Sequence, residues 1–146
     1  MDHDHFMGLA LREAQEASDK GNVTVGSVIV RDGEVIGHGQ NRVGTSGDST
    51  DHAEVAAIRD ACRTVGSADL AGATLYTTTE PCPMCLGAIH VAGIQQLVLG
   101  ARHHKIGLTI FGDYSVEKVI ELIKSDMTLV TGILEPDCEE MRHRSL

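Results

Sequence analysis

Four residues in two short segments have the types and spacing of a catalytic zinc site. His52 is followed two residues later by Glu54, and further along the chain Pro81 precedes a Cys-x-x-Cys pair, Cys82 and Cys85. One imidazole and two thiols are three strong zinc ligands, and tetrahedral zinc keeps its fourth position for water in catalytic sites. A closed structural site would need a fourth Cys or His. The pattern predicts a water-activating zinc held by His52, Cys82 and Cys85.

Glu54 is the candidate proton carrier beside this zinc. On an ideal helix a two-residue spacing points the side chains of His52 and Glu54 to nearly opposite sides. In the first turn, however, both side chains can lean over the helix end. Glu54 could then reach the water and act as a general base that later returns the proton to a leaving amine.

Both ligand segments are expected at helix starts. Helical spacing of apolar residues resumes at His52, with Asp51 as the expected N-cap. The strand-like run Ala73–Thr79 ends before Pro81, and proline suits the first turn of a helix over Met84–Ala92. The partial positive charge of a helix N-terminus favours thiolates, so these positions should support metal binding.

The other segments alternate between helical and strand patterns. A 3.6-residue apolar period predicts a helix over Phe6–Ala17, and Asp32-Gly33 is a hairpin turn between two β-branched runs. Gly37–Asp51 is rich in turn-forming residues and is expected to be a loop. This alternation predicts an α/β fold, a helix/sheet/helix sandwich on a mixed sheet. The later elements are expected to be a strand over Gln96–Gly100, a loop over Ala101–Asp113, a helix over Val116–Lys124, a strand over Met127–Gly132 and a helix over Glu135–Arg142.

Length and composition bound the class of protein. A chain of 146 residues is expected to form one domain over 1–146. Aromatic residues make up only 3% and Trp is absent, so rings that could stack on single-stranded nucleic acid are scarce. The formal charge of −9 also works against phosphate backbones, although Arg142 and Arg144 could form a local basic patch. We therefore do not expect nucleic acid as a partner.

Cellular context is inferred from the N-terminus and the cysteines. The start of the chain is polar and acidic rather than basic and then apolar, and no apolar stretch of about eighteen residues occurs, so we expect a cytoplasmic protein without a membrane partner. In a reducing compartment the cysteines are not expected to form disulfides, and Cys62 and Cys138 are expected to be buried helix residues. His3 and His5 are expected to lie in a frayed terminus.

The two motifs match the H-x-E…P-C-x-x-C signature of zinc nucleobase deaminases. Thr50–Arg59 and Leu75–Ile89 are the most specific parts of this resemblance. The chain resembles the cytidine and deoxycytidylate deaminase superfamily from about Phe6 to its last helix, in particular the branch of cytosine, guanine and tRNA adenosine deaminases. The resemblance implies a three-layer α/β/α sandwich with a mixed five-stranded sheet, one zinc per chain, and a homodimer or higher homo-oligomer.

The same resemblance assigns roles to individual residues. His52, Cys82 and Cys85 match the zinc ligands, and Glu54 matches the proton shuttle. It implies attack of zinc-bound hydroxide on the ring carbon that bears the exocyclic amine, with Glu54 protonating first the ring nitrogen and then the departing ammonia. Water is the only co-substrate. Two further residues are candidates for binding the base: Asn41, in Gly39-Gln40-Asn41-Arg42, and Ala53, between the two motif residues.

Two substrate classes and one non-catalytic role compete as the function of the chain. The main expectation is a free nucleobase or related amino-heterocycle, of the guanine, cytosine or aminotriazine type, as in purine and pyrimidine salvage. The alternative substrate is tRNA adenosine, because Gly100-Ala101-Arg102 and Val130–Leu134 resemble segments of the tRNA adenosine deaminases. The formal charge of −9 and the absence of a longer, basic last helix count against this alternative. A non-catalytic zinc-stabilised binding module is a third possibility, although loss of Glu54 would have been its mark and Glu54 is present.

The segment that covers the substrate is expected in the loop Ala101–Tyr114. The aromatic C-terminal residues typical of the guanine and cytosine enzymes are missing here, so another segment must close the pocket. Phe111, Asp113 and Tyr114 are the candidate substrate-binding residues of this loop, and His103 and His104 are further candidates. Asp113 could accept a hydrogen bond from a ring N–H or an amine.

Overall fold

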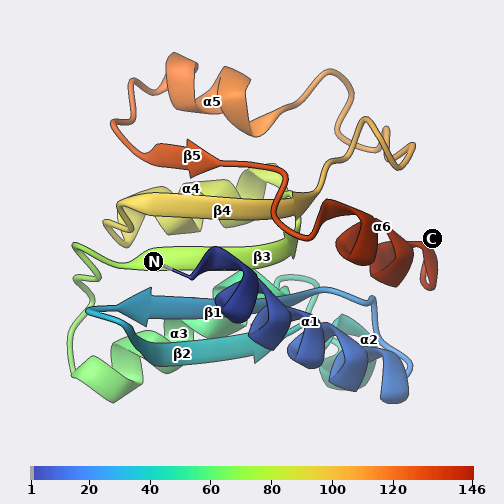
Figure 1. The fold of residues 1–146 in the computed structure, drawn as a ribbon, viewed down its shortest axis with the longest axis horizontal. Coiled ribbons are helices and arrows are strands. Elements are labelled where there is room, and N and C mark those ends of the chain that lie inside the picture. The colour runs from blue at the N-terminus through green and yellow to red at the C-terminus, as the bar shows by residue number, and fades with distance from the viewer. Residues whose placement is uncertain (1) are drawn as a thin grey trace.

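The computed structural model describes residues 2–146, which form a mixed sheet in the order β2-β1-β3-β4-β5 (Figure 1). The central strand β3 pairs antiparallel with β1 and parallel with β4; β1 also pairs antiparallel with β2, and β4 parallel with β5. The predicted five-stranded mixed sheet is confirmed. The strands are β1 (Gly26–Arg31), β2 (Glu34–Gln40), β3 (Thr74–Thr79), β4 (Gln96–Ala101) and β5 (Thr128–Val130).

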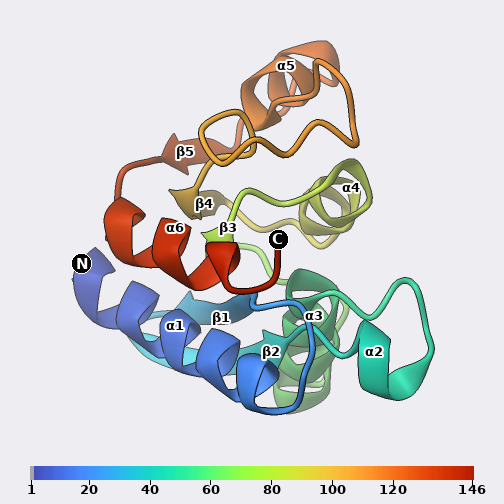
Figure 2. The ribbon, with the colours of Figure 1, turned by 90° about the vertical axis from the view of Figure 1, so that its right-hand side faces the viewer.

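Helices cover both faces of the sheet, so the predicted three-layer α/β/α sandwich is also confirmed. Seen along the sheet, α1 and α6 lie on one face and α3, α4 and α5 on the other (Figure 2). No helix within residues 2–146 combines the length and the apolar character needed to cross a membrane. The helices are α1 (His3–Asp19), α2 (Val43–Ser46), α3 (Ala53–Val65), α4 (Pro83–Val91), α5 (Val116–Leu122) and α6 (Glu135–His143).

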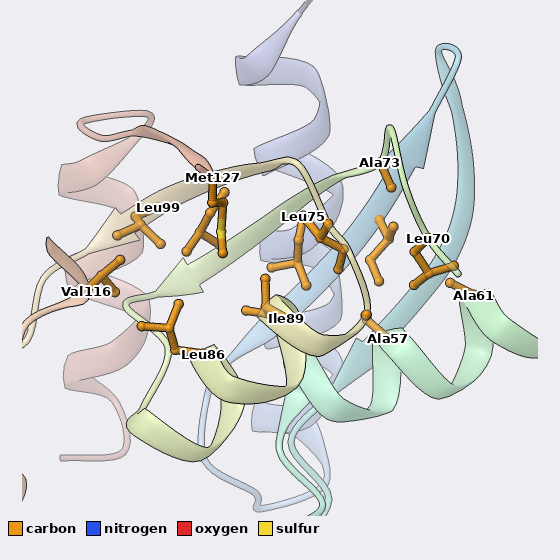
Figure 3. Close-up of a cluster of buried hydrophobic side chains, with 14 residues drawn as sticks. Ala57, Ala61, Leu70, Ala73, Leu75, Leu86, Ile89, Leu99, Val116 and Met127 are labelled. Atoms are coloured by element: carbon orange, nitrogen blue, oxygen red, sulfur yellow. The ribbon is translucent and has the colours of Figure 1, made fainter. Parts of the chain in front are cut away.

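Each face of the sheet has its own apolar core. Leu75 and Leu99 project from the sheet toward Leu86 and Ile89 of α4, and all four side chains are fully buried (Figure 3). On the opposite face, Tyr76 of β3 lies in a second cluster together with residues of α1 and α6. These contacts fix α3 and α4 beside each other on one face, which is what brings the two predicted ligand segments together.

The β1–β2 hairpin turns as the sequence predicts. Asp32 has φ +53° and Gly33 has φ +78°, and two successive positive φ angles are the mark of a type I′ turn. This turn matches the twist of the flanking strands and sets the register in which Arg31 faces Glu34.

The loop predicted over Gly37–Asp51 is wrong in its first part. β2 continues to Gln40, and a short helix, α2, follows. Gly39 serves close packing here rather than a turn: a Cβ on it would lie 2.5 Å from the carbonyl oxygen of Ala53 and from the amide nitrogen of Ala57. The glycines allow α3 to approach β2 closely, so substitution there would displace the helix that begins with the His52 motif.

The expected fraying around His3 and His5 is also wrong. Asp2 caps α1 by accepting a hydrogen bond from the amide of His5 at 3.0 Å. His3 Nδ1 lies 2.7 Å from the hydroxyl of Tyr76, which is buried in β3. Satisfying this hydroxyl holds the start of α1 on the sheet.

Candidate active site

The site forms where α3 and α4 begin. His52 is the N-cap of α3 and Cys82 the N-cap of α4, and neither cap makes a side-chain capping hydrogen bond. The expectation that Asp51 caps α3 is therefore wrong by one residue. Because the cap positions are taken by candidate ligands, amide groups of both first turns remain free to face the metal site.

The three predicted ligands converge. His52 Nδ1 lies 3.6 Å from Cys82 Sγ and 3.5 Å from Cys85 Sγ, and the three ligand atoms all lie within 4.8 Å of one another. Zinc bound tetrahedrally, at about 2.0 Å from nitrogen and 2.3 Å from sulfur, separates these atoms by about 3.5 Å. The imidazole nitrogen therefore already lies at the distance from both sulfur atoms that a single zinc ion requires.

Backbone amides of the two first turns support the sulfur atoms. Cys85 Sγ accepts from the amide of Val55 in α3, and Cys82 Sγ accepts from the amide of Cys85. Hydrogen bonds from Cys85 and His52 hold the pKa of Cys82 well below its ordinary value, although burial opposes them. The same contact with Cys82 raises the pKa of His52. Such bonds orient metal-binding thiolates and stabilise their charge.

Glu54 lies in the same cavity as His52 and Cys82 but is not one of the three converging ligands. Its side chain is almost completely buried, and this burial raises its pKa to about 7, with a smaller contribution from Cys82. His52 and the hydroxyl of Thr77 act in the opposite direction. A carboxyl group with a pKa near neutrality can both accept and return a proton, as a shuttle requires.

A cavity of about 250 Å³ opens over these residues. The cavity brings together most of the predicted site residues, whereas Cys85 is fully buried and does not line it; the predicted residues that line it are Asn41, His52, Ala53, Glu54, Cys82, His103 and Phe111. The complete lining is Val23, Val25, Asn41, Val43, Ser49, His52, Ala53, Glu54, Thr79, Glu80, Cys82, His103, Leu108, Ile110, Phe111 and Arg142.

Asn41 is buried on the wall of this cavity. Its Oδ1 accepts a hydrogen bond from the amide of Val43 at 3.1 Å, which fixes the orientation of the side chain. This bond leaves the Nδ2 group available to donate to an acceptor on a bound base.

The loop after β4 forms an aromatic group above the cavity. The rings of His103 and Phe111 stack with centroids 6.0 Å apart, and Tyr114 packs beside both. The hydroxyl of Tyr114 donates to the carbonyl of Pro81 at 2.5 Å. Tyr114 and the exposed Asp113 do not line the cavity, and neither does His104. Tyr114 instead fastens the loop to the segment that carries the Cys82 motif.

Glu80 organises this loop, a role that sequence reasoning missed. Its buried carboxylate accepts from Arg102 Nε at 3.0 Å, from the amide of His103 at 3.0 Å and from the amide of Val116 at 2.9 Å. Burial raises the pKa of Glu80, but these hydrogen bonds and the Arg102 charge outweigh it, and the pKa is lowered. The only signal in the sequence was the place of Glu80 directly before the Pro-Cys pair.

Other lining residues could not be placed in the site from the local sequence. Leu108 and Ile110 come from the loop and Arg142 from α6, and none belongs to a motif. Only the packing of α6 against the same sheet brings Arg142 to the cavity (Figure 2).

Comparison with known proteins agrees with this geometry. The sequence-family model of the cytidine and deoxycytidylate deaminase zinc-binding region matches residues 1–101 of the chain. The chain belongs to this family. Membership in a zinc-binding deaminase family and the fit of the His/Cys/Cys cluster together assign one zinc ion to the chain, as the sequence predicts.

Relatives within the deaminase family differ in the substrate for which they are named. A tRNA-specific adenosine deaminase of Bacillus subtilis (strain 168) is 38% identical over 93% of this chain and 83% of its own length. A guanine deaminase of the same strain is 42% identical over 88% of this chain and 83% of its own length. A solved structure from work on A-to-I editing by tRNA A34 deaminases superposes with a TM-score of 0.81 at 37% identity, covering 94% of this chain and 98% of that one.

Proposed function

We propose that the chain is a zinc-dependent hydrolytic deaminase that converts adenosine to inosine in tRNA. The observation that supports this most is the likeness to a tRNA A34 deaminase structure, because it extends over 94% of this chain and 98% of the other. The likeness therefore extends well beyond the zinc motifs. In this proposal tRNA adenosine replaces the free base as the leading substrate. The expectation that nucleic acid is not a partner, which was drawn from the net charge, is withdrawn.

The size of the cavity suits a single base. Pockets for drug-sized ligands have volumes of about 300–1,000 Å³, whereas this one has about 250 Å³. Deaminases that act on nucleic acid take the target base out of the strand into a pocket of this kind, and a single-stranded loop offers its bases at low cost. An adenosine of the anticodon loop could place its base in the cavity while the rest of the RNA stays outside.

The roles of the side chains follow from their positions. A zinc ion held by His52, Cys82 and Cys85 would acidify water and polarise it toward attack. Glu54, with a pKa near neutrality, would take a first proton from the attacking water and pass it to the ring nitrogen, and would then carry the remaining hydroxyl proton to the exocyclic amine, which leaves as ammonia. Asn41 Nδ2 donates to an acceptor on the base and orients the ring over Glu54. Ala53 also lines the cavity.

One site uses residues from almost the whole length of the chain, from Val23 to Arg142. For this reason we treat residues 1–146 as one deaminase domain. A homodimer, which the sequence resemblance implies, is kept as part of the proposal.

Deamination of a free base of the guanine type is the second candidate. The formal charge of −9 favours it, since phosphate contacts depend on Lys and Arg. The 42% identity to the guanine deaminase of Bacillus subtilis supports it as well.

The deciding experiment measures inosine formation and ammonia release on a panel of substrates. The panel contains a tRNA anticodon stem-loop with adenosine at the wobble position, the same stem-loop with that adenosine moved into the stem, adenosine, adenine, guanine and cytosine. Turnover of the wobble stem-loop alone would support the proposal, and turnover of guanine alone would replace it with the second candidate.

The matched control is Glu54→Gln, which keeps the size and shape of the side chain. We expect it to retain zinc and to lose a factor of about 10²–10⁴ in kcat, the usual contribution of a general acid and base. Full activity of this variant would remove Glu54 from the mechanism.

A further inference from the structure

Within the described residues Arg142 makes no ion pair, unlike three other cations of the C-terminal half. Arg102 pairs with Glu80 and Glu117, Lys105 with Glu135, and Arg144 with Glu140. In the part of the chain that the structure describes, no carboxylate lies within ion-pair distance of Arg142. Acidic residues outnumber Lys and Arg in the protein by 21 to 12, so the missing carboxylate partner of Arg142 does not reflect a shortage of carboxylates.

The unpaired guanidinium is partly buried and faces the active-site cavity. Arg142 lies in the last turn of α6 and lines the cavity together with His103 and Phe111. Burial lowers the pKa of Arg142, and no acidic group acts in the opposite direction. A half-buried cation without a counter-charge is costly, which favours an anionic partner from outside the chain.

The side chain is held in place rather than mobile. Arg142 Nη1 donates to Ser145 Oγ at 3.1 Å. Ser145 Oγ in turn accepts from the amide of Thr24 at 3.0 Å and lies 2.8 Å from the Thr24 hydroxyl. Thr24 lies between Val23 and Val25, which both line the cavity, so the guanidinium is tied through Ser145 to another segment of the cavity wall. A positioned guanidinium fork is the protein group best suited to bind a phosphate.

We propose that Arg142 binds a phosphate attached to the sugar of the nucleotide that is deaminated. This rests on the proposed function, in which the base enters the cavity and its sugar and phosphates stay at the mouth. Arg142 would then be a specificity residue that distinguishes a nucleotide from a free base. It would supply positive charge at the cavity mouth of a protein whose net charge is negative. The phosphate could belong to the RNA backbone or to a free nucleotide.

The first test uses binding of the wobble stem-loop to the inactive Glu54→Gln protein, with and without Arg142→Gln. Single methylphosphonates, which remove the charge of one phosphate, are placed on either side of the target nucleotide. We expect one of them to weaken binding about tenfold, the size of one charge-assisted hydrogen bond. Arg142→Gln should cause the same loss and should no longer respond to that methylphosphonate. Equal sensitivity of both proteins to both methylphosphonates would overturn the proposal.

The control variant is Arg144→Gln, which removes a cation two residues away that is exposed and already paired with Glu140. It should bind the stem-loop series as the Arg142-containing protein does. Adenosine 5′-monophosphate and adenosine distinguish the two sources of phosphate. A preference for the nucleotide that Arg142→Gln abolishes assigns a terminal phosphate, and a loss confined to the stem-loop assigns the backbone; both support the phosphate site.

A second probe separates this proposal from the proposed function. If the protein deaminates only a free base, the tRNA proposal fails, but inorganic phosphate should still compete with that base at the cavity mouth. Arg142→Gln should relieve this competition, whereas Arg144→Gln should leave both the competition and kcat on the base within about twofold of the unaltered protein. Absence of any competition by phosphate, or an equal effect in both proteins, would overturn the assignment of Arg142.

Discussion

The two sides of the cavity are built in different ways. The floor, formed by His52, Glu54, Cys82 and Cys85, consists of helix starts packed on the sheet, and its side chains are mostly buried. The roof, residues 103–114, lacks regular helix or strand, and Ile110 is 73% exposed there. Chemistry needs fixed distances, so it is placed on rigid elements, whereas selection among substrates is left to a loop and to α6.

The largest effect should come from removing one zinc ligand of the floor. In Cys82→Ser the alcohol replaces a thiolate that is supported by the amide of Cys85. We expect zinc to fall from about one per chain to well below half, and activity to fall by more than about 100-fold, since even the partners of zinc ligands account for 10–100-fold. Metal content by atomic emission and inosine or ammonia release measure the two losses.

Cys62→Ser is the matched control for that variant. Cys62 is a half-buried cysteine of α3, the helix that His52 caps, but it is outside the converging ligand set. Zinc and activity should stay close to the unaltered protein. Loss of zinc in Cys62→Ser, or full zinc in Cys82→Ser, would contradict the ligand assignment.

The next largest effect should come from changing Glu80, which connects the floor to the roof. Glu80→Gln removes the charge that holds Arg102 and two backbone amides, and breaking such a buried pair costs about 3 kcal/mol in the free energy of unfolding. Denaturant unfolding measures this cost. Glu117→Gln is the control, because Glu117 also pairs with Arg102 but is largely exposed, and such pairs contribute less than about 1 kcal/mol.

The Glu80 effect should also depend on pH. The pKa of Glu80 in the folded protein is below its ordinary value of 4.5, so the carboxylate contributes stability above that value. As the pH falls through the folded pKa, Glu80 is protonated and this contribution is lost. The difference in unfolding free energy between the unaltered protein and Glu80→Gln should therefore shrink below about pH 4.5. A difference that stays constant with pH would mean that the charge of Glu80 is not what stabilises the loop.

The same contrast explains what could be predicted from the sequence. The residues of the floor could be predicted from two local motifs, because a few consecutive residues are enough to place His52 or Cys82 at a helix start. The sheet and its helices were also predictable, since apolar periodicity is local. The place of Arg142 in the cavity wall could not be predicted from the sequence, which indicated only a possible basic patch with Arg144. Its place depends on how α6 packs against β3 and β4, strands that lie far from α6 in the sequence. Gly39 was misread as a turn residue, since close packing against Ala53 leaves no mark in the neighbouring sequence.

The smallest expected effect tests whether the roof binds substrate or only covers it. Phe111→Ala removes a ring that lines the cavity and stacks on His103. Such a contact is worth about 1 kcal/mol, so KM should rise about fivefold while kcat changes by less than about twofold, because Phe111 belongs to the roof and not to the zinc ligands or the proton carrier. Ile123→Ala is the control: Ile123 is as exposed as Phe111, at 40%, but lies outside the cavity. A fall in kcat instead of a rise in KM would mean that the roof positions Glu54 or the zinc ligands, and the separation of chemistry from selection would not hold.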